Sequence, residues 1–408
     1  MSNTQILSSL SICGRITLDM HSLNNEGGEG NQILTRQVTI VDDQGEIASV
    51  NAVSGDMLKH IQAEHLWLKA KEDNLNLCSS CLSFNANRIV SAGEFVTFLQ
   101  GVNVEEFENN DKQRYTEIKS QIRTSKDDKR IKQLKEELNK LEKKYLLNKF
   151  SEDDKRNYSE IKNKHKNANG DEKKELGKKI KELEKKYKTE IDDSGKLDKM
   201  LGLCSLDDLE GVLVTAEGNN LPRKSCAEFG WLVALPDKSK TESFFHVKYV
   251  SDAGTTQGEE GANVGQNIFH RPANSGIYAL VSNFDLYRIG YNDISKKYTI
   301  TNEERIKRYK AFLQSILYTF IKPKGAMRNT QNPHIVKFEG VIATSSKTMP
   351  APTVSPIDSE YISQVEKIKK SLNSIETDAI NVISFKSIGE FSEKMVALIN
   401  NSTPFKLN

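Results

Sequence analysis

The chain has 408 residues, enough to bury a sizeable core and to form one large or two ordinary domains. No apolar run approaches the length that crosses a bilayer, and the polar start MSNTQILSS is not a signal peptide. We therefore expect a cytoplasmic protein with no membrane partner. Five cysteines, an odd number, argue against a disulfide framework.

The net charge of +2 hides an uneven distribution along the chain. Residues 111–200 contain 28 Lys and Arg against 20 Asp and Glu, whereas the remainder contains 30 against 36 and is mildly acidic. A nucleic-acid-binding body of that sign has to concentrate its basic groups in a groove. The overall pI therefore excludes no class of partner.

The first predicted element is a strand, because LSICGRITLDMH alternates between apolar and polar residues. One face carries Leu10, Ile12, Ile16, Leu18 and Met20. The other face is polar, which predicts a half-exposed strand that presents Ser11, Arg15, Thr17, Asp19 and His21. The following HSLNNEGGEGNQ is rich in Gly and Asn, residues that allow a sharp turn and expose the backbone to a ligand.

The segment Val50–Glu72 predicts an amphipathic helix. Ser54 is the expected N-cap, and Asp56 lies in the first turn, where the helix dipole favours a carboxylate. The apolar face steps at helical spacing through Leu58, Ile61, His65 and Leu68. Lys59 and His60 lie off that face, near the helix N-terminus, which is a favourable place for a phosphate.

From Asp111 to Lys199 the composition changes to Lys, Glu, Asp and Asn. Apolar residues recur there at steps of three and four, including Ile131, Leu134, Leu138, Leu141 and Tyr145. The pattern predicts a helical hairpin or short coiled coil. The alternative is a solvated insertion without a partner, since alternating charge on a helix usually faces water. If the insertion has a partner, its charge favours nucleic acid.

Strand patterns return in GVLVTAE, FGWLVALP and GIYALVSNFDLYRIG. A clear helix then begins with a capping box at Thr301 and Glu304 and ends at Pro323 and Gly325, before the strand HIVKFEGVIAT. Strand, helix, two strands, helix, strand is the order of a ferredoxin-like α+β fold and of an RNA-recognition motif.

Several segments together resemble one known family: HSLNNEG, EGNQ, TRQVTIVDDQGEIASVNAVSGDMLKHIQAEHL and FFHVKYVSD. They are similar to the DevR-type autoregulator group of CRISPR-associated (Cas) family seven over roughly residues 5–105 and 200–350. This family supplies the repeated backbone subunit of type I effector (Cascade) complexes, and we expect subtype I-B. The resemblance implies a palm-like fold with a long thumb.

The expected domains follow from the element order and the resemblance together. Residues 1–110 and 200–350 form the RNA-recognition-motif-like palm, residues 111–199 the charged insertion, and residues 351–408 a C-terminal helical segment after a Pro-rich linker. The resemblance places the thumb at about 245–276, in a Gly-, Asn- and Ser-rich stretch. Phe269 is expected to stack on RNA bases, although it could equally pack on its own palm.

The polar residues that cluster at strand and loop ends are the candidate RNA ligands. Their joint placement on one side of the palm is what we expect to form a binding groove. They are Arg15, His21, Asn24, Asn25, Lys59, His60, Lys322, Lys324, Arg328 and Asn329. Arg36 and Arg271 are further candidates outside these clusters, and Phe269 is the candidate in the thumb.

The resemblance implies a role in antiviral defence. The subunit would bind guide crRNA through its sugar-phosphate backbone, whatever the sequence, and leave bases free to pair with target DNA. Expected partners are head-to-tail copies of the chain and other effector subunits: a crRNA 5′-end cap subunit, a large subunit and a crRNA-processing endonuclease.

The sequence leaves three further possibilities open: a structural zinc site, a ribonuclease and a DNA-binding autoregulator. Cys78 and Cys81 have metal-type spacing, and a structural zinc could recruit Cys204 with one of Cys226, His60 or His65; the alternative is a turn with reduced thiols. A metal-dependent ribonuclease could use Asp19, His21, Glu26 and Glu29. The loop resembles non-cutting type I subunits, so we expect no enzyme and no catalytic cofactor. The third alternative is a DNA-binding autoregulator, but the sequence shows no helix-turn-helix signal for it.

Overall fold

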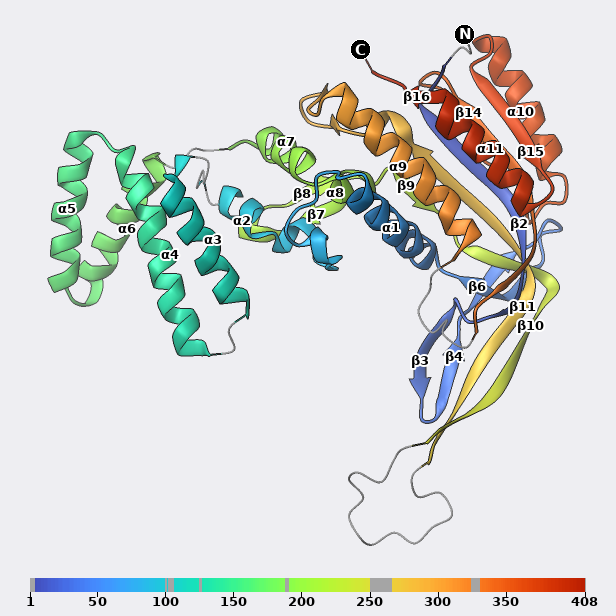
Figure 1. Cartoon of the computed structure of the whole chain (residues 1–408), viewed down its shortest axis with the longest axis horizontal. Helices are drawn as coiled ribbons and strands as arrows, with labels where there is room; N and C mark the ends of the chain where they lie inside the picture. The colour runs from blue at the N-terminus through green and yellow to red at the C-terminus, as the bar shows by residue number, and fades with distance from the viewer. Residues whose placement is uncertain are drawn as a thin grey trace, which may run out of the picture.

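The computed structural model describes residues 4–99, 101, 106–124, 127–187, 191–249, 266–323 and 331–407. Its centre is a ten-stranded sheet covered by helices, and a helical arm extends to one side (Figure 1). The α+β class is confirmed. The main path of the sheet runs in the order β15 (Ile380–Phe385), β14 (His334–Ser345), β2 (Ser9–His21), β11 (Gln266–Asp285), β10 (Leu232–Tyr249), β6 (Ile47–Val53) and β5 (Gln37–Val41).

Four of these strands and two helices form the centre of the domain. Along the chain they follow as β2, α1 (Gly55–Glu72), β10, β11, α9 (Asn302–Ile321) and β14, which is the strand and helix order that the sequence predicted. In the sheet β14 and β11 flank β2, and β10 pairs with the far edge of β11. The likeness to an RNA-recognition motif stays a prediction.

The predicted caps of both helices are present. The Ser54 side chain accepts a hydrogen bond from the Met57 amide, and Thr301 accepts one from the Glu304 amide at 3.2 Å. Glu304 also binds the buried Arg308 at 2.9 Å. On α1, Leu58 and Ile61 are buried as expected, but Leu68 is exposed.

The prediction that β2 is half-exposed is wrong, because both of its faces are covered. Leu10, Ile12, Ile16 and Leu18 face the main core, which α1, α9 and α11 (Ile388–Asn401) complete. The opposite face belongs to a second core in which Cys13 packs with Val341, Tyr361 and Val365. Two polar residues of that face bind backbone carbonyls instead of water: Ser11 donates to Pro352 at 2.6 Å and Arg15 to Pro356 at 2.8 Å, whereas Asp19 near the strand end is exposed.

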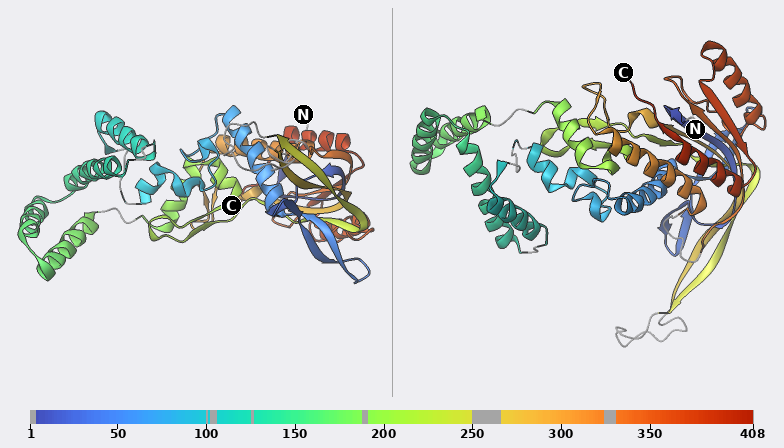
Figure 2. Two further views of the ribbon diagram at one scale, coloured as in Figure 1. Left: turned by 90° about the horizontal axis from the view of Figure 1, so that it is seen from below. Right: turned by 45° about the horizontal axis from the view of Figure 1, so that its top comes forward.

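The C-terminal segment is more than the helical appendage that the sequence suggested. Its helix α10 (Tyr361–Ile375) covers β2, its strand β15 extends the sheet beside β14, and α11 packs on α9 (Figure 2). The last strand, β16 (Ser402–Pro404), pairs in parallel with β1 (Gln5–Leu7). The segment is therefore part of the sheet domain.

A closed ring of three buried amides lies where β2 ends. Asn24 donates to Asn51 at 2.7 Å, Asn51 to Asn274 at 2.9 Å, and Asn274 back to Asn24 at 2.6 Å. Tyr278 donates to the Asn51 oxygen at 3.1 Å, and its hydroxyl lies 2.8 Å from His21 Nε2. The ring ties the end of β2 to β6 and β11, and each ring amide has its partners inside the protein.

Two hairpins project from the edge near this ring. One joins β3 (Asn25–Glu29) and β4 (Gln32–Thr35); the other consists of the distal parts of β10 and β11. Figure 1 shows both pointing away from the two chain ends. The two hairpins touch each other, since β4 pairs with β11 at Gln32 and His270.

The charged insertion consists of two helical hairpins and not the single one predicted. The first pairs α3 (Asn109–Thr124) with α4 (Asp128–Asn148), and the second pairs α5 (Glu152–Asn167) with α6 (Gly170–Tyr187). They form the arm in Figure 1. The chain enters the arm after α2 (Gly93–Leu99) and leaves it before α7 (Asp193–Leu203) and α8 (Ser205–Glu210).

The two hairpins are a tandem repeat. In sequence, YTEIK at 115–119 recurs as YSEIK at 158–162, and LEKKY at 141–145 recurs at 183–187. In the structure the same contacts recur. Phe107 stacks on Tyr145 with ring centroids 4.0 Å apart, and Phe150 stacks on Tyr187 at 4.3 Å. Shared sequence and shared geometry together identify a duplicated unit.

Polar contacts close both units in the same way. In the first, Lys144 pairs with Asp111 at 2.8 Å, and in the second Lys186 pairs with Asp154 at 2.6 Å. The first unit also docks on the sheet domain, because Tyr115 reaches Thr97 of α2 at 2.5 Å. Tyr158 occupies the equivalent place in the second unit.

We expect the free energy of unfolding to fall as the pH drops from about 6.5 toward 4. Burial lowers the pKa of His21 from 6.5 to about 4, so within this window the unfolded chain binds a proton that the folded chain does not. The loss should reach about 3 kcal/mol at the acidic end. Urea unfolding at a series of pH values measures it.

His21→Gln should flatten this pH dependence, even if it lowers stability at neutral pH. His60→Gln is the matched control at an exposed position and should keep the wild-type slope. An unchanged slope in the His21 variant would contradict the assignment.

A deletion of residues 107–149 should leave the sheet domain folded. It places Phe150 where Phe107 was and brings Tyr158 to the position of Tyr115, so one complete hairpin remains docked on α2. The thermal midpoint of the sheet domain should stay within about 3 °C of wild type. Deletion of 107–156 removes Phe150 and Asp154 as well, and this variant should lose arm helicity by circular dichroism. If both deletions behave alike, the two units are not equivalent.

Candidate nucleic-acid interface

The structure separates the predicted RNA ligands into several groups, not one groove. Arg15 lies on the face of the sheet that the C-terminal segment covers, and its guanidinium is 5.7 Å from the centre of the Tyr361 ring. Lys59 and His60 lie on α1, which covers the other face. The expected joint placement on one side of the palm is therefore wrong for these residues.

Asn24 is buried in the amide ring and His21 is buried beside it against Tyr278, so neither side chain is available to RNA in this structure. Their polarity serves the junction of strands, a use that sequence alternation does not distinguish from solvent exposure. Asn25 follows at the start of β3, and neither its side-chain nitrogen nor its oxygen has a hydrogen-bond partner. Both atoms are buried, so Asn25 does not present them to RNA in this structure either.

Arg36 is half-exposed and already engaged. Its guanidinium forms an ion pair with Glu26 and lies 5.1 Å from the centre of the Trp231 ring. Trp231 itself is largely exposed. These three residues make a polar and aromatic surface near the base of the projecting hairpins.

Lys322 is exposed at the C-terminal end of α9, where its carbonyl lies 2.9 Å from His65 Nε2. Lys324, Arg328 and Asn329 lie outside the described residues. The chain returns at Gln331, which donates to the Pro272 carbonyl at 3.3 Å. The basic segment that starts at Lys322 therefore leads back to the base of the β10–β11 hairpin.

The predicted thumb is in part a regular hairpin. Strands β10 and β11 pair from Tyr249 and Gln266 inward, and residues 250–265 lie outside the described residues. The Phe269 backbone pairs with His246, but the position of its side chain is not described. Arg271 is half-buried opposite Phe244. Phe245 and Val247 are 59% and 49% exposed, so one face of the hairpin presents apolar groups to solvent.

The residues of the ribonuclease alternative do not form a metal-ligand cluster in the described part of the chain. His21 is buried, Glu26 pairs with Arg36, and Asp19 accepts a hydrogen bond from Ser275 at 2.5 Å. Among the described residues, one group has at least three potential metal ligands within 4.8 Å of one another. It is a cluster of cysteines in another part of the chain.

That cluster contains Cys78, Cys81 and Cys204, the three cysteines that the sequence proposed, together with Asp207. Neither Cys226 nor a histidine is the fourth member. The signal that sequence reasoning missed is the spacing in Cys204-Ser-Leu-Asp207, which matches that of Cys78 and Cys81. Burial and the neighbouring Cys204 raise the pKa of the Asp207 carboxyl to about 8.

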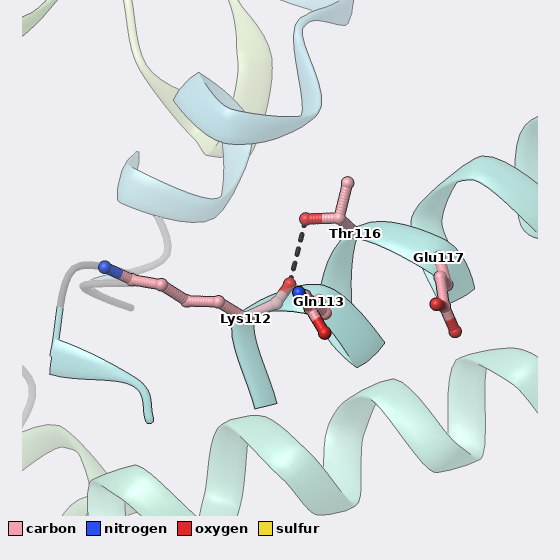
Figure 3. Close-up of a pocket in the computed structure, with 4 residues that line it drawn as sticks. All are labelled: Lys112, Gln113, Thr116 and Glu117. Carbon is pink, nitrogen blue, oxygen red and sulfur yellow. Dashed lines mark hydrogen bonds between the residues drawn. The ribbon is translucent and has the colours of Figure 1, made fainter. Parts of the chain in front are cut away.

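A shallow depression on the arm is lined by four residues of α3: Lys112, Gln113, Thr116 and Glu117 (Figure 3). Thr116 donates to the Lys112 carbonyl at 2.9 Å, and the side chains spread apart over an open helix surface. Such a surface lacks the enclosed, convergent groups of a small-molecule site.

None of the described helices is long and apolar enough to span a bilayer.

Comparison with solved structures finds subunits of RNA-guided complexes. Two chains described as a "CRISPR RNA-guided surveillance complex", one of them "pre-nicking", are 11% and 12% identical to this chain. The pre-nicking chain, at 12%, has a TM-score of 0.40, with 91% of this chain and 90% of that chain covered. The other has a TM-score of 0.37, with 98% and 96% covered.

Csc2 of Thermofilum pendens is 12% identical, with a TM-score of 0.31 and 95% and 81% of the two chains covered. No curated protein is similar at a significant level. A family model, in contrast, matches residues 12–366, which is most of the chain. The protein therefore belongs to the family of the CRISPR-associated negative auto-regulator DevR/Csa2.

Proposed function

We propose that this chain is the repeated backbone subunit, Cas family seven, of a type I-B CRISPR effector complex and that it binds guide crRNA independently of sequence. The observation that carries the proposal is the family match over residues 12–366. The projecting hairpins support it, since they offer an extended surface, and the exposed Lys322 adds a cation at the end of α9. Such a surface suits a long, uniform ligand.

Backbone contacts explain how one protein accepts every guide. Phosphate and ribose are the same at each position, while base pairing with target DNA supplies the specificity. The binding groups must then be cations and backbone amides instead of side chains that read base edges. Lys322, Lys324 and Arg328 meet this requirement by charge and by their spacing along one segment.

Copies of the chain would assemble head to tail along the guide. A heterologous contact repeated without closure gives an open helical filament. The exposed Phe245 and Val247 on the β10–β11 hairpin are suited to cover a neighbouring copy, because this hairpin extends beyond its own domain. The cap subunit, the large subunit and the processing endonuclease would join the ends and sides of that filament.

The triple substitution of Lys322, Lys324 and Arg328 by Ala should weaken binding of two unrelated single-stranded RNAs to the same extent. Each lost phosphate contact should lower the slope of log K against log salt by about 0.7. Fluorescence anisotropy at several salt concentrations measures both quantities. The matched control is Lys367, Lys370 and Lys386 to Ala, an equal change of charge in the C-terminal segment.

The control variant should bind as wild type does. A loss confined to one RNA sequence would contradict backbone recognition, and an equal loss in the control would reduce the effect to net charge. Tight, selective binding of its own promoter duplex would instead favour the autoregulator that the family description names.

We also propose that the subunit does not cut RNA. The burial of His21 and the ion pair of Glu26 with Arg36 support this proposal, because metal-assisted hydrolysis requires clustered ligands that can reach the ion. Purified protein assembled on a long guide with magnesium should leave both guide and complementary RNA intact in a gel assay. Magnesium-dependent cleavage that Asp19→Asn abolishes would establish the ribonuclease instead.

A further inference from the structure

The cysteine cluster at the base of the arm has no role in the RNA binding proposed above. Cys78 and Cys81 lie in the segment between α1 and α2, whereas Cys204 and Asp207 lie where α7 meets α8. All four side chains are buried, and their potential ligand atoms lie within 4.8 Å of one another. We propose that these four residues bind one structural zinc ion.

The Asp207 carboxylate is oriented as a metal ligand would be. One of its oxygens accepts hydrogen bonds from Arg88 Nε at 3.2 Å and from the Ile89 amide at 3.4 Å. The other oxygen faces the sulfur atoms, 3.3 Å from Cys81 Sγ and 3.7 Å from Cys78 Sγ. Such an outer hydrogen bond fixes a ligating carboxylate and leaves one oxygen for the ion.

Backbone geometry also prepares the first pair of cysteines. The Cys81 amide donates to Cys78 Sγ at 3.4 Å, at the start of the short 3-10 turn Cys81–Ser83. An N–H directed at sulfur favours the thiolate, which is the form that binds metal. The turn thus holds two sulfur atoms toward the same point.

A bound divalent cation would stabilise this buried group further, because Arg88 pairs with only one oxygen of Asp207 and the other oxygen faces the thiols. Thiols are weak donors, so three of them satisfy a buried carboxylate poorly. With a divalent ion, three thiolates and one carboxylate leave a local charge of −2, and the adjacent Arg88 guanidinium reduces it to −1. Burial of charged ligands is tolerated when they are paired with such an ion.

The ligand set favours zinc over other metals. Three sulfurs and one carboxylate oxygen suit a soft to borderline ion with tetrahedral geometry, whereas magnesium and calcium prefer sets of oxygen ligands. In a tetrahedral site, zinc–sulfur distances of about 2.3 Å place the sulfur atoms about 3.8 Å apart, which is within the 4.8 Å that contains the four ligand atoms here. Four protein ligands leave no open position, so the ion would be structural.

The ion would anchor the arm. The chain runs from Cys81 through α2 into the arm and returns through α7 to Cys204, so the four ligands lie on the outgoing and returning segments. Hydrogen bonds already join these segments, since Ser205 donates through its amide to the Asn76 carbonyl at 2.8 Å. Zinc would turn this contact into a crosslink that holds the root of the arm against the sheet domain.

Metal analysis of the full-length protein tests the inference without RNA. Wild type purified under reducing conditions from zinc-supplemented cells should contain about one zinc per chain by inductively coupled plasma mass spectrometry. Cys81→Ser and Asp207→Asn should retain at least about 10-fold less zinc after dialysis. Cobalt-exchanged wild type should show thiolate-to-cobalt charge-transfer absorption, which reports sulfur ligation directly.

Cys226→Ser and Cys13→Ser are the controls, because both thiols are buried but lie outside the cluster. They should keep the full zinc content. Wild type with no zinc, no cobalt charge-transfer band and five titratable thiols after unfolding would overturn the inference, and so would a Cys78–Cys81 disulfide found by mass spectrometry. If Cys81→Ser does not fold, release of zinc from wild type by a chelator replaces that measurement. The zinc measurements do not depend on RNA, so they test the zinc site even if the proposed RNA binding proves wrong.

Discussion

The closed ring of Asn24, Asn51 and Asn274 is the constraint on which the outline of the molecule depends. Each amide donates to the next, so the removal of any member breaks two buried hydrogen bonds at once. The ring fixes the end of β2 against β6 and β11 at the point where the two hairpins leave the sheet. The ring therefore adds side-chain hydrogen bonds to the backbone pairing of these strands at the place from which both hairpins project.

The sequence predicted the regular elements well where local signals are strong. The caps at Ser54 and Thr301 and the apolar spacing of α1 and α9 are local, and the structure contains them. Exposure was harder to predict, because alternation in β2 does not reveal what lies on its polar side. Ser11 and Arg15 are satisfied by carbonyls more than 300 residues away in the chain, and no local pattern signals such a contact.

In the candidate sites, too, the sequence reveals local spacing but not the contacts between distant segments. Cys78 and Cys81 were identified from their spacing and Cys204 was named as a further ligand, yet Asp207 was not, because an aspartate in a helical segment has many uses. His21 and Asn24 have the chemistry of RNA ligands, but their neighbours decide that they are structural. The repeat in the arm, in contrast, is visible in the amino-acid sequence itself, since LEKKY occurs twice and aligning the chain with itself reveals both units.

Duplication also sets how the arm can change over generations. Two similar coding stretches in tandem can misalign during recombination, and the products gain or lose one unit at a time. Because each unit carries its own Phe, Asp and paired Tyr residues, every such product closes its own aromatic core. The length of the arm can thus change by whole helical hairpins, while the sheet domain stays the same.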